Sequence, residues 1–405
     1  MARVPICGAV ANPLSLLPVA LAAGGGRVDG ADAAGLVAAG FTLRQRSAPL
    51  VRAMTGRRSA ILLPPSGAIV TALAASDGRG AVLLSPDASP DAIGGALRVA
   101  AVGAVFTTRA LATQVPDGEH ALVLLDDAPR RAIVRAHGAE SVVDLGAHFG
   151  LDLEGEEDDG SDEECVVTWA PGSDAPPHGT VFSHRNLFAL ARGAVDAASL
   201  QKGDHVLWAL PADDLAGLAF GMAGPLLAGA RVTALAAGDA DPGLRVLERD
   251  QVTVMAGAAA LYASLLDALA RRGTPLAAPA LRVCVVLGTP VDIGLQSLWL
   301  ARTGVELRQA FGVAEAPLCL FNAPHFPNRR GTLGVPFPGV QVSVRDAGTG
   351  SAQPVGVAGA LSIRGGLVAT GSLAVGGDGP PRRAGWLDTP VVVCERPDGA
   401  FELAG

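Results

Sequence analysis

The chain has 405 residues, of which 49% are hydrophobic and 17% are charged, and its formal net charge is −8 at pH 7. This length exceeds one ordinary hydrophobic core, so we expect two or three subdomains around a shared interior. The composition excludes a disordered chain. The negative net charge offers no basic surface, so no nucleic acid partner is expected.

Cysteine usage and the amino-terminal segment indicate the compartment. The five cysteines are widely scattered, with no CxxC pair and no histidine at zinc-ligand spacing, so a reducing cytoplasm is the simpler expectation. The apolar run from Arg3 to Ala23 resembles a short secretory signal, but Pro13 and Pro18 interrupt it. We favour the opening helix and loop of a domain. Since no apolar stretch reaches about twenty uninterrupted residues, we expect a soluble protein without a membrane span.

Between Arg58 and Gly150, short β-rich runs alternate with alanine-rich runs. Such alternation is typical of βαβ units and predicts a parallel sheet. The expected strands are Ser59–Leu63, Ala81–Leu84, Ala104–Thr107 and Ala121–Leu125, and the expected helices are Ile69–Ala75 and Ala92–Ala101.

The segment Asp152–Glu164 carries nine acidic residues and almost no apolar ones. A metal site is one interpretation of such a run, but without histidine it is more typical of a solvated linker, which we expect here. A second alternating region follows. Its expected strands are Val166–Trp169, Val206–Leu210, Val232–Ala234, Val252–Met255, Val283–Leu287 and Glu306–Ala310, and its expected helices are Leu215–Leu227, Ala259–Ala270 and Ile293–Thr303.

From Gly331 the pattern changes to short strands with frequent Gly and Pro, which predicts a small antiparallel barrel. Its expected strands are Val340–Val344, Ala360–Arg364, Val391–Cys394 and Ala400–Leu403. The sequence therefore predicts an α/β fold with two βαβ-type subdomains, mostly parallel sheets and a small antiparallel β-barrel. The expected boundaries are 1–151, an acidic linker at 152–164, 165–330 and 331–405.

The segment Thr168–Leu187 reads TWAPGSDAPPHGTVFSHRNL and predicts a Gly/Ser/Pro loop directly after a strand and before a helix. In that position exposed backbone N–H groups and a helix N-terminus can hold a phosphate, although many polar βα turns look similar. His184 with Asp204 or Asp213 is a conceivable hydrolase pair, but no Gly-x-Ser-x-Gly elbow accompanies them. We therefore expect a capping or core role for His184.

This segment resembles the adenylate-forming, AMP-binding family that includes the fatty-acid–CoA ligases, in which a Ser/Thr-rich loop ends in Pro-Lys-Gly and Ser-His-x-Asn-Leu follows. Further motifs resemble those of the family in the same order over roughly residues 55 to 403, and so many collinear motifs are more specific than any one of them. They are Leu210-Pro211 with Gly217, Gly229-Ala230, Val252-Thr253 through Leu261-Tyr262, Gly288, Phe311-Gly312-Val313-Ala314-Glu315, Gly334 with Pro336, Gly339, Gly359, and Gly385-Trp386-Leu387-Asp388-Thr389.

The resemblance implies the large N-terminal part of an acyl-CoA ligase, with the site at the carboxyl ends of the strands where the subdomains meet. In the family a carboxylate attacks the α-phosphorus of ATP to give acyl-AMP and pyrophosphate, and a thiol then takes the acyl group. The implied cofactors are ATP or AMP and Mg²⁺, and the implied substrates are a small carboxylate and CoA or a carrier-protein thiol. The family's small C-terminal domain, with its catalytic lysine, does not follow in this sequence, so we expect it to be lost or supplied by a separate partner.

The resemblance also implies site residues. The catalytic candidates are Glu315, which is also the magnesium candidate, and His178. The nucleotide-binding candidates are Gly172, Ser173, Gly179, Gly288, Gly312 and Ala314, and the acyl-pocket candidates are Asp214, Ala256 and Gly257.

Several positions depart from the family pattern, and the departures weaken the expectation of catalysis and of nucleotide binding. Histidine carries little positive charge at pH 7, and an apolar side chain cannot accept from the ribose hydroxyls. The departures are His178 for lysine, Asp174 and Ala314 for threonine, Asp214 for histidine, Pro390 for glycine and Val391 for aspartate. Two interpretations stay open: a ligase of reduced competence, and a non-catalytic relative that binds an acyl or nucleotide ligand or a partner protein.

Overall fold

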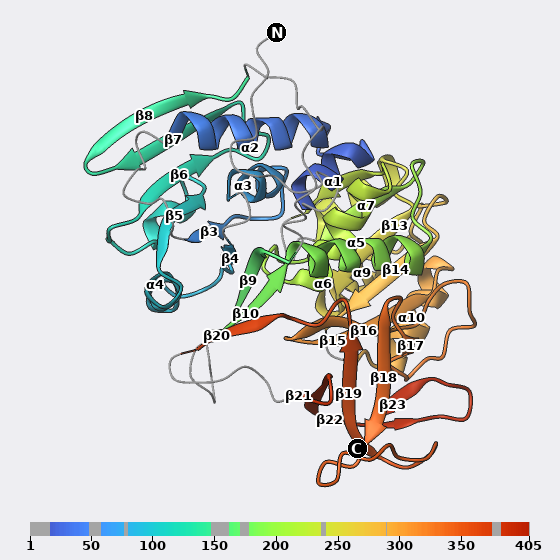
Figure 1. The fold of residues 1–405 in the computed structure, drawn as a ribbon. Helices are drawn as coiled ribbons and strands as arrows, with labels where there is room; N and C mark the ends of the chain where they lie inside the picture. The colour runs from blue at the N-terminus through green and yellow to red at the C-terminus, as the bar shows by residue number, and fades with distance from the viewer. Residues whose placement is uncertain are drawn as a thin grey trace. The chain divides into compact units, whose positions relative to one another are not determined.

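The computed structural model describes residues 17–47, 58–76, 80–146, 162–170, 178–235, 240–288, 290–374 and 382–404. The chain divides into two compact units. The first contains Met1–Phe188, Pro211–Asp214 and Ala369–Gly379, and the second contains Ala189–Leu210, Leu215–Val368 and Pro380–Gly405. The predicted fold class is confirmed, because both units contain sheets with parallel strands and a separate antiparallel sheet follows (Figure 1).

One nine-stranded sheet runs through the described part of the first unit, in the order β20-β10-β9-β4-β3-β5-β6-β7-β8. The pairs β4–β3, β3–β5 and β5–β6 are parallel, as the sequence predicted, and β9 also pairs in parallel with β4, although its strand was expected in the second region. The remaining pairs are antiparallel, and they involve strands that the sequence pattern missed. The bounds are β3 Arg58–Leu62, β4 Ala81–Leu83, β5 Val102–Thr107, β6 Ala121–Leu125, β7 Arg131–Ala136, β8 Ala139–Asp144, β9 Glu164–Ala170, β10 His178–Ser183 and β20 Gly371–Ala374.

Helices cover both faces of this sheet. Successive side chains of a strand point to opposite faces of the sheet, so every second residue faces the same way. On one face, Ala60 and Leu62 of β3 share a hydrophobic core with two residues of α4, Ile93 and Leu97. Figure 1 shows α2 and α3 on the opposite face. The other elements of this unit are α1 Leu17–Gly24, β1 Arg27–Val28, β2 Ala31–Asp32, α2 Ala33–Ser47, α3 Ala68–Ser76, α4 Pro90–Val99 and η2 Leu111–Gln114.

The predicted acidic linker meets this sheet at its last residue. Glu164 is the first residue of β9, and its Oε1 lies 2.5 Å from Arg58 Nε of β3. Gly80, which precedes β4 between these strands, has φ +77°, a conformation that favours glycine, and a Cβ there would be 1.8 Å from the same carboxylate oxygen and would displace it. Residues 152–161 lie outside the described part of the chain. The boundary expected at 165 falls inside this sheet, because β9 pairs with β4.

The second unit contains a sheet in the order β12-β11-β13-β14-β15-β16-β17, parallel from β12 to β15. Its strands are β11 His205–Ala209, β12 Arg231–Ala234, β13 Val254–Ala258, β14 Val283–Leu287, β15 Leu307–Val313, β16 Ala316–Phe321 and β17 Val335–Pro336. Its helices are α5 His184–Ala198 (which begins in the first unit), α6 Leu215–Leu218, the π-helical η3 Ala219–Ala223, α7 Gly224–Leu227, α8 Ala240–Arg249, α9 Ala259–Arg272 and α10 Ile293–Thr303.

Both faces of this sheet are packed. On one face, Leu207 and Met255 share a core with Tyr262 of α9 and Trp299 of α10, and the buried Tyr262 hydroxyl donates to the Val285 carbonyl over 2.9 Å. On the other face, a Cβ at Gly221 of η3 would lie 2.1 Å from Trp208 Cδ1 of β11. Glycine therefore lets the helical segment approach the indole closely.

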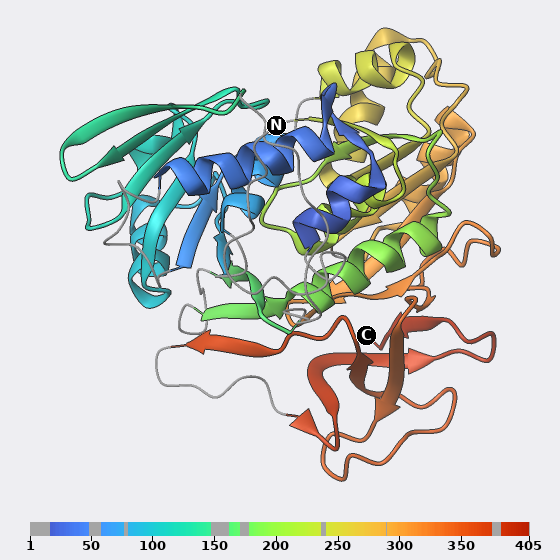
Figure 2. The same cartoon turned by 45° about the horizontal axis from the view of Figure 1, so that its top comes forward.

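A small antiparallel sheet follows in the order β18-β19-β22-β21, with β23 paired to β22, and it curls on itself (Figure 2). Its strands are β18 Val340–Arg345, β19 Gly359–Gly365, β21 Arg382–Arg383, β22 Trp386–Glu395 and β23 Phe401–Leu403. One strand of the predicted barrel region, β20, does not join the small sheet. It pairs instead with β10 of the first unit's sheet. No helix among the described residues is long and apolar enough to cross a membrane.

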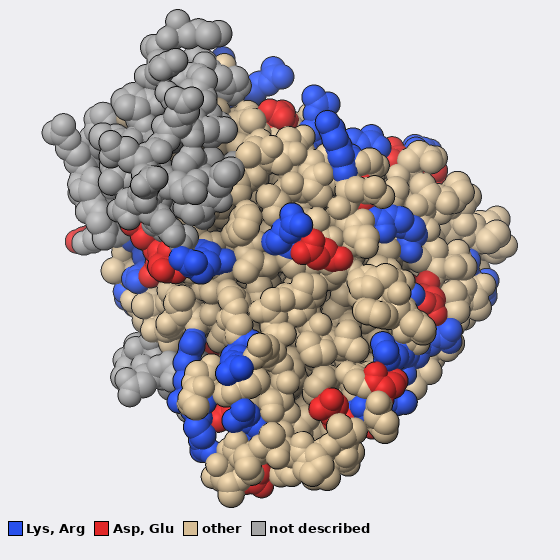
Figure 3. Space-filling view, turned by 45° about the vertical axis from the view of Figure 1, so that its right-hand side comes forward, with Lys and Arg blue, Asp and Glu red and all other residues tan. Residues whose placement is uncertain are grey.

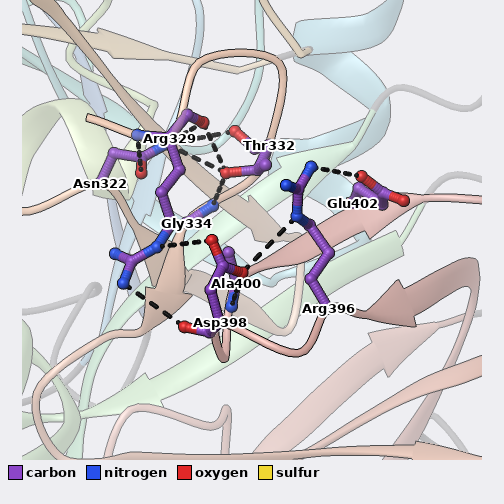
Figure 4. A network of polar contacts seen from close by, with 8 residues as sticks. All are labelled: Asn322, Arg329, Thr332, Gly334, Arg396, Asp398, Ala400 and Glu402. Carbon is purple, nitrogen blue, oxygen red and sulfur yellow. Dashed lines mark hydrogen bonds and ion pairs between the residues drawn. The ribbon is translucent and has the colours of Figure 1, made fainter. Parts of the chain in front are cut away.

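A polar network holds the connection after β16 against the β22–β23 hairpin (Figure 4). Arg329 Nε donates to Asp398 Oδ2 over 3.2 Å, and the Asn322 side chain accepts from the Arg329 amide and donates to the Thr332 carbonyl. On the hairpin itself, Arg396 pairs with Glu402. This network fixes the entry into the small sheet.

A second polar network lies at the amino ends of the parallel strands of the second unit. The Asp204 carboxylate, which is 3% exposed, accepts from Arg282 Nη2 over 2.6 Å and from Thr253 Oγ1 over 2.7 Å, and also from the Gln201 amide. Burial opposes ionisation of Asp204, but these hydrogen bonds outweigh it and lower the pKa of the carboxyl group.

We predict that Asp204→Asn lowers the free energy of unfolding by about 2 kcal/mol at neutral pH, a value reduced because Arg282 is partly exposed. A lowered folded-state pKa adds stability above the unfolded-state pKa of about 3.9, and that stability is lost as the pH falls through the folded-state pKa. The difference between wild type and variant should therefore shrink below about pH 4. Urea titrations at several pH values measure the free energy of unfolding of the wild type and the variant, with the exposed Asp267→Asn as the control. Equal effects of the two variants would contradict the stabilising role of the Asp204 carboxylate.

Candidate functional site at the carboxyl ends of the strands

The parallel strands β11, β13, β14 and β15 are neighbours, so their carboxyl ends lie along one edge of the second unit's sheet. In α/β sheets ligands bind at this edge. Most of the predicted site residues of this unit come together there. Ala256 and Gly257 lie in the last half of β13, and Gly288 follows β14 directly. Gly312 is the last residue but one of β15, and Ala314 and Glu315 form the turn after it.

The loop after β14 begins with Gly288, which is exposed and has φ +99°, a conformation that favours glycine. The buried side chain of Gln309 holds this loop against β15. Its Oε1 accepts from the Val291 amide over 2.8 Å, and its Nε2 donates to the Ala310 carbonyl over 2.8 Å. Gln309 was absent from the predicted site. A lone amide side chain in the apolar run Leu307–Phe311 was the available signal, because buried polar side chains need partners.

Strands β15 and β16 form a hairpin whose turn is Ala314 and Glu315, since Val313 pairs with Ala316. A Cβ at Gly312 would lie 1.9 Å from the Pro317 carbonyl oxygen, so the tight, irregular hairpin requires glycine there. The Glu315 side chain is half-buried and Ala314 is exposed. The hairpin thus presents Glu315 in a turn at the carboxyl edge.

The predicted phosphate loop differs from expectation. Gly172 and Ser173 lie outside the described residues. The structure shows that the loop joins two antiparallel strands, β9 and β10, in which His178 pairs with Ala170 and Gly179 with Trp169. The helix start expected at Ser183–Leu187 is confirmed, because α5 begins at His184, but the strand β10 that comes between the loop and this helix was not predicted.

The start of α5 has its own hydrogen bonds. The Asn186 Oδ1 accepts from the Ser183 amide over 2.9 Å, and the Ser183 hydroxyl accepts from the Asn186 amide, which makes a reciprocal cap. His184 is 2% exposed and its Nδ1 accepts from the Leu17 amide over 3.2 Å. Burial lowers the pKa of His184 to about 4. The Ser-His-x-Asn motif therefore has structural roles here, and the core role expected for His184 is confirmed.

Asp214 lies in the first unit, on the turn after β11, where its amide donates to the Pro211 carbonyl. Its neighbour Asp213 is the more unusual residue. Burial, together with the charges of Asp214 and Asp87, raises the pKa of Asp213, and its Oδ1 has no hydrogen-bond partner among the described residues. Asp213 and Asp214 are adjacent in the sequence, which gives no sign that their environments differ.

Val391 lies in β22 and is half-buried. Its amide donates to Thr389 Oγ1, and that hydroxyl donates to the Leu361 carbonyl over 2.8 Å. The carboxylate of this stretch belongs to Asp388, which accepts from the Ser362 hydroxyl over 2.6 Å. Position 391 itself therefore offers only an apolar side chain.

Comparisons with known proteins identify one family and several relatives. A family profile described as "AMP-binding enzyme" matches residues 50–373. Novobiocin biosynthesis protein H of Streptomyces niveus is 31% identical over 78% of this chain and 51% of its own length. Feruloyl-CoA synthase of Amycolatopsis sp is 27% identical over 74% of this chain and 63% of its own length. The chain thus spans about half to three fifths of these relatives.

Among solved structures, apo MatB from Rhodopseudomonas palustris superposes with a TM-score of 0.80 at 19% identity, covering 96% of this chain and 78% of that one. ATP-bound MatB from the same organism gives a TM-score of 0.79 over the same coverage. At this identity the likeness establishes the fold.

We predict that Gln309→Leu lowers the free energy of unfolding by about 2 kcal/mol, because the Val291 amide and the Ala310 carbonyl both lose their partner. Gln296→Leu is the matched control: Gln296 is also buried in this unit, but its Oε1 has no partner among the described residues. Chemical denaturation of both variants tests this. A cost at Gln296 equal to that at Gln309 would show that Gln309 does not fix the loop.

Proposed function

The chain belongs to the AMP-binding enzyme family, and we propose that it binds an adenine nucleotide and a carboxylate as an acid–thiol ligase of reduced adenylating power. The observation that carries the proposal is the carboxyl edge of the second unit. There Gln309 holds the Gly288 loop beside the strand that leads into the Glu315 turn. Such an arrangement of loops at one edge is where α/β proteins bind nucleotides.

The relatives support the chemistry. One is named as a feruloyl-CoA synthase, and one structural neighbour was solved with ATP bound. For this chain we propose the same reaction class. A carboxylate oxygen forms a bond to the α-phosphorus of ATP, the bond to pyrophosphate breaks, and the acyl-AMP then passes its acyl group to a thiol, CoA or a carrier-protein thiol, with release of AMP.

The first step moves negative charge onto the leaving pyrophosphate, so its rate depends on positive charge and donors placed near the phosphates. In the proposed assignment His178 stands in place of the family's loop lysine, and Ala314 has no hydroxyl to donate. These substitutions remove stabilisation that would exist only as the charge develops, so they slow adenylation more than they weaken binding.

Glu315 is the proposed magnesium ligand. Among the described residues no group of three or more His, Cys, Asp or Glu side chains is arranged to hold a metal ion. Mg²⁺ is commonly held through one or two carboxylates together with the phosphates of the substrate, which is the role proposed for Glu315. Mg²⁺ bound there would neutralise part of the phosphate charge.

Position 391 favours a second candidate, a non-catalytic protein that binds an acyl or nucleotide ligand. Two ribose hydroxyls facing Val391 have no acceptor there, and each lost hydrogen bond costs about 1 kcal/mol. Carboxylate-dependent exchange of pyrophosphate into ATP separates the two candidates, because only a ligase catalyses that exchange.

We predict that Val391→Asp tightens ATP binding about tenfold, because a carboxylate accepts charge-assisted hydrogen bonds from ribose hydroxyls. Val392→Asp is the matched control, since Val392 is the next residue of the same strand and is 47% exposed. Calorimetric titration with ATP and Mg²⁺ at constant salt measures both variants against the wild type. Equal affinity of wild type and Val391→Asp would show that position 391 does not face the ribose.

A further inference from the structure

A cavity of about 400 Å³ lies in the first unit, between the β7–β8 hairpin and the connection that precedes β6. Figure 1 shows this hairpin at the outer end of the sheet. The cavity is lined by Val115–Gly118, His120, Leu122 and Arg135–Glu140, all of which the structure describes. It therefore belongs to one unit and shares no residue with the proposed nucleotide and carboxylate site.

The strand register brings two histidines to this cavity. Leu122 of β6 pairs with Arg135 of β7, and Arg135 pairs with Glu140 of β8, so these three side chains point to one face of the sheet. Extending the β6–β7 register by two residues places His120 opposite His137 on that face. Directly opposite residues of an antiparallel pair have Cβ atoms about 5 Å apart, a separation from which two imidazoles can bind one ion.

The backbone positions both histidines. His137 and Gly138 form the two-residue turn of the hairpin, with φ +51° and +76°, a turn type that suits the twist of the flanking strands. A Cβ at Gly118 would lie 2.8 Å from His120 Nδ1, so glycine lets the connection before β6 approach this ring closely. The half-buried His120 is thus held under the connection, and the exposed His137 is held on the turn.

The ring nitrogens of these two histidines are not engaged by the protein. Neither His120 nor His137 makes a hydrogen bond or an ion pair within the described part of the chain. His205 differs, because its two ring nitrogens form hydrogen bonds with the Asp250 carbonyl and the Thr233 hydroxyl. A neutral imidazole keeps one nitrogen lone pair, which can bind a metal ion.

The charges around the cavity favour a cation over an anion. Its lining contains the acidic Asp117 and Glu140 and the basic Arg135, and Arg135 Nε lies 2.8 Å from Glu140 Oε2. Because this pair neutralises itself, Asp117 leaves the lining with a net negative charge. On the face shown in Figure 3, by comparison, acidic and basic side chains are interspersed. An anion in the cavity would be repelled by Asp117.

We propose that His120 and His137 bind one transition-metal ion of the class of Zn²⁺, Ni²⁺ and Cu²⁺. These ions take imidazole nitrogen as a ligand, whereas Mg²⁺ and Ca²⁺ prefer carboxylate and carbonyl oxygens, and an organic cation would leave the imidazoles unused. In the described ranges no three His, Cys, Asp or Glu side chains are arranged as a metal site, so water completes the coordination shell. The bound ion joins the connection before β6 to the β7–β8 turn and so stabilises the folded first unit.

The test is calorimetric titration of the metal-free full chain with Ni²⁺ and with Zn²⁺ in a buffer that does not chelate them. The wild type should bind a single ion saturably. His120→Phe keeps an aromatic ring without nitrogens, and His137→Asn keeps a residue that suits the turn. Each change should weaken binding about tenfold or more. His325→Ala, at an exposed histidine outside the cavity, is the control and should leave the affinity within about twofold.

The electron paramagnetic resonance spectrum of bound Cu²⁺ gives a second readout. It should show two imidazole nitrogens in the wild type and one in each single variant, a pattern that partial unfolding does not produce. The proposal is wrong if the wild type binds no ion saturably, or if His120→Phe and His137→Asn bind as tightly as His325→Ala. Displacement of Ni²⁺ by an equal concentration of Mg²⁺ or Ca²⁺ would also contradict it, because it would assign a carboxylate site instead.

Discussion

The parallel alignment of β11, β13, β14 and β15 is the constraint on which the rest of the second unit depends. Each strand is crossed over by a helix, so each returns to the sheet in the same direction and ends at the same edge. The completely buried strand Val283–Leu287 sits inside this set. Its position decides where Gly288 emerges, and the buried amide of Gln309 then fixes the loop that follows.

The backbone of the site and its side chains have separate physical requirements. The close approaches at Gly312 and Gly221 and the positive φ of Gly288 depend only on glycine, and all three glycines are present. Charge stabilisation depends on particular side chains, and the proposed positions carry His178, Ala314 and Val391. We therefore infer a scaffold that keeps the geometry of the family while its electrostatic contribution to catalysis is reduced.

Much of the fold was predictable from the sequence, because buried parallel strands appear as short apolar runs such as Val283–Leu287. The strands β7, β8, β10 and β20 were missed. They pair in antiparallel fashion with partners that a local pattern does not reveal. The helix that begins at His184 was predicted, whereas the six residues of β10 between the loop and this helix were not. Gly312 was predicted from its motif, whereas Gln309 depended on a tertiary partner, the Val291 amide, that sequence does not show.

The central proposal is that altered side chains on the family's fold limit acyl-adenylate formation. The most direct measurement is carboxylate-dependent exchange of labelled pyrophosphate into ATP, with ferulate, benzoate and malonate as substrates and the Amycolatopsis feruloyl-CoA synthase measured alongside. The account predicts exchange at least about a hundredfold slower than that enzyme, since the proposed site lacks two or more charge-assisted contacts. Exchange at a rate equal to that enzyme's would contradict it.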